Sequence, residues 1–177
     1  MTNLTIGRPE PTEYAPYYEK YVSLVPEDDV VSGLDEQGRT TLDLLRGLEE
    51  EGSRYRYAPG KWSIKEVAGH IIDTERVMAY RALYFGRRNE AAVPGFDQDV
   101  TAGHAPYDRL PLSEILDEYE SVRRSSLHLF RHFDKDAWLR RGAANNNEVT
   151  VRALAYVILG HERHHVEILR SRYIRTN

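Results

Sequence analysis

The chain of 177 residues contains no cysteine. This absence excludes disulfide bonds, a thiolate nucleophile and every zinc site that uses cysteine ligands. Any metal ion must therefore be held by histidine, aspartate or glutamate. A reactive thiol, if the chemistry needs one, must come from a separate small molecule.

Basic charge is not in excess, because 24 Lys and Arg stand against 28 Asp and Glu and leave a formal net charge of −4. Proteins that bind phosphate backbones usually show a basic face or stripe, so we expect no nucleic-acid partner. Arginine doublets occur at 87–88, 123–124 and 140–141. Each is interpreted as a solvated helix end.

Long apolar runs are also missing, since no stretch approaches the ~18 residues that span a bilayer. The N-terminal letters MTNLTIGRPEPTEY lack the basic start and apolar run of a signal peptide. We therefore expect no membrane partner and a location in the cytoplasm.

Four segments show the three- and four-residue spacing of apolar side chains that is typical of amphipathic helices. They span residues 28–51, 63–86, 113–133 and 150–173. Ser63 and Glu66 match a capping box at the start of the second. A short helix is expected within EYAPYYEKYVSLVP, and no segment shows the alternation of a strand. The pattern predicts one all-α domain, a four-helix bundle with a long crossover loop between helices 2 and 3.

The fourth segment contains ILGHERHHVEIL, which holds three of the seven histidines. Each residue of an α-helix advances by about 100°, so His165 lies about 40° from His161 and one turn along. Histidines at i and i+4 can bind one cation. Leu154, Ile158 and Leu169 bracket the pair, so its face is expected to point inward. The alternative is a pair of histidines with ordinary hydrogen bonds.

His70 strengthens the metal hypothesis, because it lies in VAGHIIDTERV on or beside the apolar stripe of the second helix. Metal sites in bundles are built from inward side chains of facing helices. His70, His161 and His165 would supply three nitrogen ligands and leave a fourth position open, which is typical of a catalytic site.

Residues 161–165, HERHH, also satisfy the H-E-x-x-H pattern of zinc proteases, in which Glu162 would activate water. No histidine follows His165, and the chain ends twelve residues after it. No strand is expected that could hold a peptide substrate. A metalloprotease is therefore the less favoured reading.

The segments YAPGKWSIKEVAGHIIDTERVMAYRALYFGR, PGFDQD and ILGHERHHVEIL resemble the DinB-like superfamily, also called YfiT-like metal-dependent hydrolases. The resemblance covers most of the chain, from about Tyr17 to Ile174. It implies a single domain over residues 1–177, with up-down-down-up helix order, and commonly a homodimer. It also implies a divalent metal, zinc or nickel, on His70, His161 and His165. Some members use a low-molecular-weight thiol such as mycothiol or bacillithiol in S-transfer.

Further candidates surround the predicted site. Asp73 and Glu162 are candidate catalytic or supporting carboxylates, although Asp73 could instead pair with Arg76 or Arg81. The other candidates are Phe96, Asp97 and Asp99 at a pocket rim, His104 as a stray ligand, His164 as a neighbour, Trp62 as a core anchor, and His128 and His132 on a helix surface.

Two classes of function remain open from the sequence. One is a metal-dependent hydrolase or thiol-dependent S-transferase that acts on a small molecule. The other is a non-catalytic module in which the histidines bind metal or stabilise a dimer.

Overall fold

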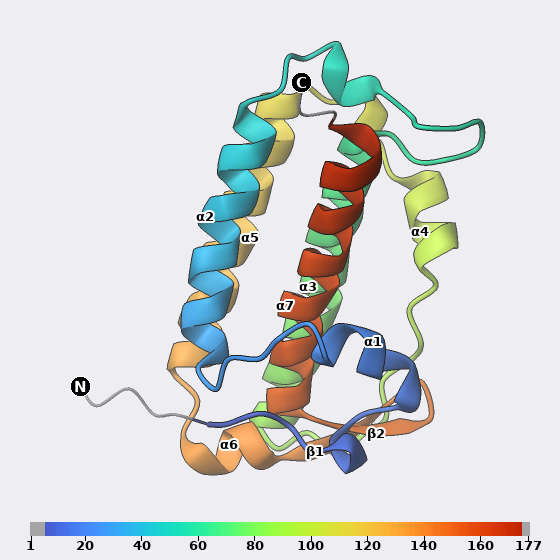
Figure 1. Ribbon diagram of the computed structural model, residues 1–177. Coiled ribbons are helices and arrows are strands. Elements are labelled where there is room, and N and C mark those ends of the chain that lie inside the picture. The colour runs from blue at the N-terminus through green and yellow to red at the C-terminus, as the bar shows by residue number, and fades with distance from the viewer. Residues whose placement is uncertain (1–5, 175–177) are drawn as a thin grey trace.

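Four long helices form the body of the computed structural model, which describes residues 6–174. They are α2 (Val30–Arg46), α3 (Ile64–Gly86), α5 (Leu112–Arg131) and α7 (Val151–Ile168). Figure 1 shows α2 and α7 running in one direction and α3 and α5 in the other. Helices α2 and α3 each pack on both α5 and α7. The predicted four-helix bundle with up-down-down-up order is confirmed.

Polar side chains define where three of these helices begin. Ser63 Oγ accepts the backbone N–H of Glu66 at 3.1 Å, and Glu66 accepts the N–H of Ser63 at 2.8 Å, as the predicted capping box requires. Asp29 caps α2 by accepting the N–H of Ser32, and Thr150 caps α7 by accepting the N–H of Ala153. Helix α2 ends at Arg46, five residues earlier than predicted, because the chain turns back after Gly47.

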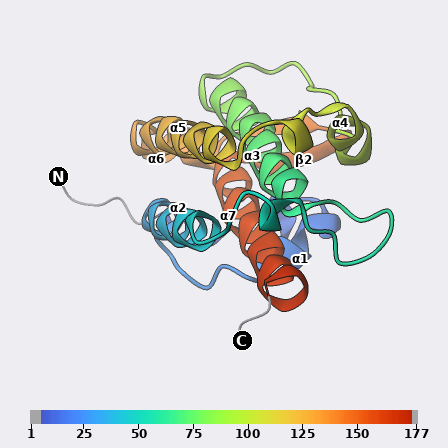
Figure 2. The same ribbon diagram turned by 90° about the horizontal axis from the view of Figure 1, so that it is seen from above.

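Two shorter segments lie against the bundle. Helix α1 (Glu19–Val22), the expected N-terminal helix, packs on α7. The long crossover after α3 carries α4 (Gln98–His104), which runs along the outside of α3 before the chain enters α5 (Figures 1 and 2). These segments create a layer over one side of the α3–α7 pair.

The expectation of no strand was wrong. After the short helix α6 (Lys135–Leu139), strands β1 (Arg141–Ala144) and β2 (Asn147–Thr150) form an antiparallel hairpin. Its two-residue turn places Asn145 and Asn146 at φ 51° and 60°, a left-handed conformation that asparagine tolerates well. Four-residue strands are too short to show a clear alternation of polar and apolar side chains. The run of asparagines at 145–147 was the available signal for a hairpin turn.

The hairpin also fixes the beginning of the crossover. The N–H of Val93 donates to the carbonyl of Ala143 at 2.9 Å, and the N–H of Asn145 donates to Val93 at 3.2 Å. This pairing places the following residues, Pro94 to Asp97, beside α3.

Arg123 is the second departure from the sequence interpretation. Its neighbour Arg124 is exposed as expected, but Arg123 is only 4% exposed and lies inside the bundle. The Arg123 guanidinium donates to Glu75 at 3.0 and 2.7 Å and to Glu162 at 2.5 Å. A buried charge is tolerated only when it is paired and hydrogen-bonded, and this arginine meets both conditions.

The same network reaches every long helix. Thr41 of α2 donates to Glu162 of α7 at 2.5 Å, and Tyr119 of α5 donates to the same carboxylate. Arg123 also donates to the carbonyl of Leu34 at 2.7 Å. We call Thr41, Glu75, Tyr119, Arg123 and Glu162 the buried ion network.

Apolar side chains pack into two clusters along the bundle. Leu154 of α7 belongs to one cluster and Leu169, directly after α7, to the other, and the polar residues of 161–165 lie between them in the chain. Within residues 6–174, no helix combines the length and the apolar character needed to cross a bilayer.

Replacing Arg123 tests the role of the network. We expect Arg123→Gln to lower the free energy of unfolding by about 3–5 kcal/mol, because Glu75 and Glu162 would remain buried without their cation. Urea denaturation measures the change. The matched control Arg124→Gln, on the exposed neighbour, should change the value by less than about 0.5 kcal/mol. Equal changes in the free energy of unfolding for Arg123→Gln and Arg124→Gln would contradict the stabilising role of the buried ion network.

Candidate metal centre

Three histidines from two helices converge in the interior. His70 comes from α3, and His161 and His165 come from successive turns of α7. One ring nitrogen from each lies within 4.8 Å of the others, and the Nε2 atoms of His70 and His161 are 2.9 Å apart. We call these three residues the histidine cluster.

Burial keeps the cluster uncharged. His70 and His161 are buried and His165 is partly buried. Loss of hydration lowers the pKa of His70 to about 4 and, together with the neighbouring His70, the pKa of His165 to about 3. The same loss, with His165 close by, holds the pKa of His161 well below its ordinary value. Neutral imidazoles keep the lone pair that a metal ligand needs.

Aromatic rings enclose the cluster. The Trp62 ring lies 4.8 Å from that of His70, and the Tyr21 ring lies 5.2 Å from that of His161, centroid to centroid. Trp62 packs on the core beside the start of α3, as expected, and it also covers a histidine. These rings restrict rotation of the imidazoles and limit access of water.

The donor set fits a divalent cation. Among the described residues, His70 and His161 each have one side-chain hydrogen-bond partner, and that partner is the other histidine. Three neutral nitrogen donors suit zinc and other late first-row metals, at bond lengths of about 2.0–2.1 Å for zinc. The cluster is compact enough for one ion to contact all three after small side-chain rotations.

Neither candidate carboxylate contacts this cluster in the structure. Asp73 accepts a hydrogen bond from Tyr107 at 2.9 Å and lies 3.7 Å from Arg76, the alternative pairing that the sequence left open. Burial raises the pKa of Asp73. Glu162 is fully buried within the ion network. In the structure, both carboxylates have their hydrogen-bond partners outside the histidine cluster.

The remaining histidines lie outside the cluster. His164 is partly exposed, with its ring against Tyr21, and His104 is exposed with Nδ1 bonded to the Val100 carbonyl at 2.8 Å. His128 and His132 are exposed on or at the end of α5, as expected.

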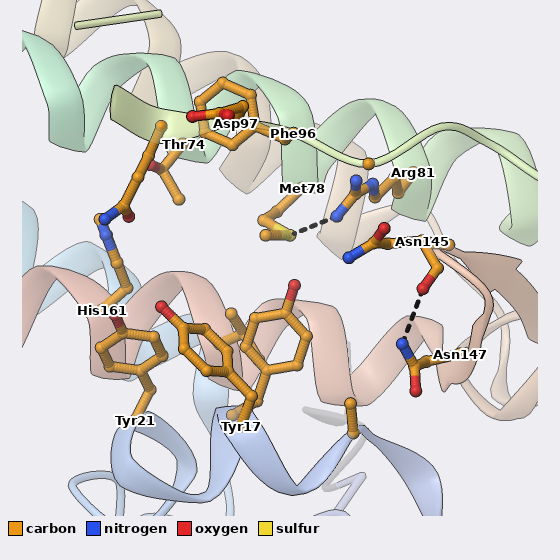
Figure 3. A pocket seen from close by; sticks show the side chains of 16 residues that line it. Tyr17, Tyr21, Thr74, Met78, Arg81, Phe96, Asp97, Asn145, Asn147 and His161 are labelled. Carbon is orange, nitrogen blue, oxygen red and sulfur yellow. Dashed lines mark hydrogen bonds between the residues drawn. The ribbon is translucent and has the colours of Figure 1, made fainter. Parts of the chain in front are cut away.

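A cavity of about 570 Å³ opens beside the cluster. Figure 3 shows His161 at one end and Arg81 and Asn145 toward the other. Phe96 and Asp97 line it, as the sequence predicted for a pocket rim, whereas Asp99 does not. A space of this size suits a small molecule.

Residues 34–169 match the DinB superfamily, which is more than half of the chain. The chain belongs to the DinB superfamily. Its fold is similar to that of YfiT from Bacillus subtilis, described as a probable metal-dependent hydrolase with an unusual four-helix bundle topology. That pair is 16% identical over 91% of this chain and 89% of YfiT, with a TM-score of 0.71.

A DinB-like protein, YjoA, also from Bacillus subtilis, is 18% identical over 79% of this chain and 85% of its own, with a TM-score of 0.58. No curated protein matches the chain. At these identities, the likeness to the two structures shows a shared fold.

Sequence reasoning missed two pocket residues of this DinB-superfamily chain. Thr74 and Arg81 follow His70 on α3 by four and eleven residues, so all three share one face of the helix. That spacing was the available signal. Arg81 looked like a surface partner for Asp73, and only the layer formed by the crossover and hairpin buries it.

The N-terminal segment that carries Tyr17 and Tyr21 is held by two ion pairs. Arg152 donates to Glu13 at 2.7 Å, and Arg163 donates to Glu27 at 2.5 and 2.9 Å. Burial alone would raise the pKa of Glu13. Hydrogen bonds from Arg152, Thr150 and the backbone of Glu10 outweigh burial and leave that pKa below its ordinary value.

This shift predicts a pH-dependent contribution of Glu13 to stability. Because the folded-state pKa lies below the unfolded value near 4.5, the contribution is present at pH 7 and is lost as the pH falls through the folded-state pKa. We expect Glu13→Gln to lower the free energy of unfolding by about 1–2 kcal/mol at pH 7 and by much less in acid.

Urea denaturation of both proteins at pH 7 and at progressively lower pH checks this prediction. The control is Glu36→Gln, on an exposed side chain of α2. A difference between wild type and Glu13→Gln that does not depend on pH would contradict it.

Proposed function

We propose that this protein binds a divalent cation through His70, His161 and His165 and uses it on a small molecule in the adjacent pocket. The observation that carries the proposal is the convergence of three neutral imidazoles beside a cavity that includes His161. A cation held by three imidazoles acts as a Lewis acid that can activate water or a thiol. Zinc and nickel are the candidate ions, because imidazole suits both.

The chain itself supplies binding and orientation. The rings of His70 on α3 and His165 on α7 lie against each other, so the packing of α3 on α7 sets the donor geometry. Trp62 and Tyr21 exclude water from the back of the imidazoles. Tyr17, Tyr21 and Phe96 provide aromatic walls on which a small molecule can lie (Figure 3).

Two reactions remain within this proposal: hydrolysis and thiol-dependent S-transfer. The description of YfiT as a probable metal-dependent hydrolase supports the first. The absence of cysteine means that S-transfer would require a low-molecular-weight thiol as a second ligand. The pocket supports either reaction better than a purely structural ion, because it opens at a cluster residue. A homodimer stays a prediction.

A metalloprotease is disfavoured by the position of Glu162. The H-E-x-x-H chemistry needs this carboxylate at the metal as a base. Here its oxygen atoms accept hydrogen bonds from Thr41, Tyr119 and Arg123 inside the bundle.

Metal analysis of the purified protein tests the cation directly. We expect about one divalent ion per chain, and a loss of cation affinity of more than about 100-fold in His70→Ala, since even supporting residues of metal sites contribute 10–100-fold. His128→Ala, an exposed histidine of α5, is the control and should retain the ion. Full metal content in His70→Ala would refute the histidine cluster as the site.

A cobalt-substituted sample separates an open catalytic site from a closed structural one. Addition of a small thiol such as 2-mercaptoethanol, or of azide, should change the visible absorption, because an open coordination position accepts an external ligand. A spectrum that does not respond to either compound would favour the non-catalytic module.

A further inference from the structure

Arg81 is a buried cation whose charge is not neutralised by the protein. It is 3% exposed and lies on α3. Its Nη2 donates to the carbonyl of Pro94 at 2.9 Å, and its Nη1 lies 3.5 Å from the sulfur of Met78. Arg81 forms no ion pair with any residue of the described range 6–174. Arg123, equally buried, has two carboxylates.

Burying a guanidinium without a counter-charge is unfavourable unless a ligand supplies one. Arg81 faces the cavity and lies toward the end away from His161, beside Asn145 (Figure 3). The carboxylate of Asp97, which also lines the cavity, accepts the N–H groups of Asp99 and Val100 as the cap of α4. Within the described residues, the cavity lining therefore holds one cation, Arg81, that is not paired with a carboxylate of the protein, and its carboxylate, Asp97, is engaged by backbone N–H groups rather than by Arg81.

A second polar group in the same wall lacks a partner. Thr74 Oγ1 is the buried side-chain atom without a hydrogen bond in the described part of the chain, and Thr74 lines the cavity. His70, Thr74, Met78 and Arg81 follow one another on one face of α3. The span from His70 to Arg81 is eleven residues, or about 16 Å along the helix axis.

Apolar side chains also line the cavity: Met78 of α3, Val157 of α7 and Phe96 of the crossover. A ligand that fits would have a charged end at Arg81, an apolar middle and a second end near His161.

We propose that the pocket selects elongated small molecules that carry a carboxylate, and that this carboxylate pairs with Arg81. Thr74 binds a polar group further along the ligand. This inference rests on the proposed function, because it takes the cavity beside the histidine cluster as the substrate pocket.

A carboxylate fits this end better than a phosphate. Guanidinium binds both through paired N–H donors. However, one guanidinium balances one negative charge, and the other polar side chains near Arg81, Asn145 and Asn147, are neutral. A phosphate dianion would leave a buried charge without a partner.

Calorimetric titration of the metal-loaded protein with 4-phenylbutyrate and with its neutral analogue 4-phenylbutyramide tests the proposal. We expect the carboxylate to bind at least about tenfold more tightly, since a charge-assisted hydrogen bond gives an advantage of that order. Arg81→Gln should reduce this preference to less than about twofold, and Arg81→Lys should retain part of it. Arg124→Gln, on an exposed arginine, is the control.

No preference in the wild type, or a full preference in Arg81→Gln, would overturn the proposal; the latter would place the carboxylate at the metal or elsewhere. Tighter binding of inorganic phosphate than of 4-phenylbutyrate would overturn the choice of carboxylate. A readout that does not need a folded variant is the Arg81 Nε–H signal in NMR spectra of the wild type. It should shift with the carboxylate and not with the amide.

The same titration on chelator-treated protein separates this proposal from the proposed function. If the chelator-treated protein keeps a carboxylate preference that depends on Arg81, and metal analysis finds that the protein binds no divalent ion, the cation is refuted and the anion subsite stands. Stoichiometric metal binding without a carboxylate preference would refute the anion subsite and leave the cation standing.

Discussion

The buried ion network around Arg123 is the constraint on which the bundle depends. One guanidinium contacts carboxylates from two other helices, and the fourth helix contributes Thr41 to the same group. Apolar contacts are not directional, whereas the hydrogen bonds of this network require defined distances and angles between groups of α2, α3, α5 and α7. The network therefore sets the rotation of each helix about its own axis, as polar groups do in other helical assemblies.

That rotation decides where the histidines point. Glu162 follows His161 directly, so the two side chains leave α7 about 100° apart. Glu75 lies five residues after His70, about 140° around α3. When the two glutamates face Arg123, the histidines turn toward the space between α3 and α7. The ion network and the histidine cluster are thus adjacent layers of the same interior, one with its charges paired and one kept neutral by burial.

Local chemistry made most of the fold predictable. The capping side chains and the spacing of apolar residues act over three or four positions, so they are visible in the chain itself. The hairpin at 141–150 was not predicted, because its strands are short and its stability comes from packing against the crossover at Val93. Arg123 was misread for a similar reason, since an arginine on a helix looks solvated until its partners on other helices are known.

For the site, the sequence by itself determined the three histidines: two share a helical face four residues apart, and the third lies beside an apolar stripe, which is local geometry. Only the tertiary structure decided that Glu162 belongs to the core, that Asp73 binds Tyr107, and that Arg81 and Thr74 share a cavity with His161. The physical reason is that a polar side chain's role depends on which groups reach it from other segments, and helical spacing carries no information about them.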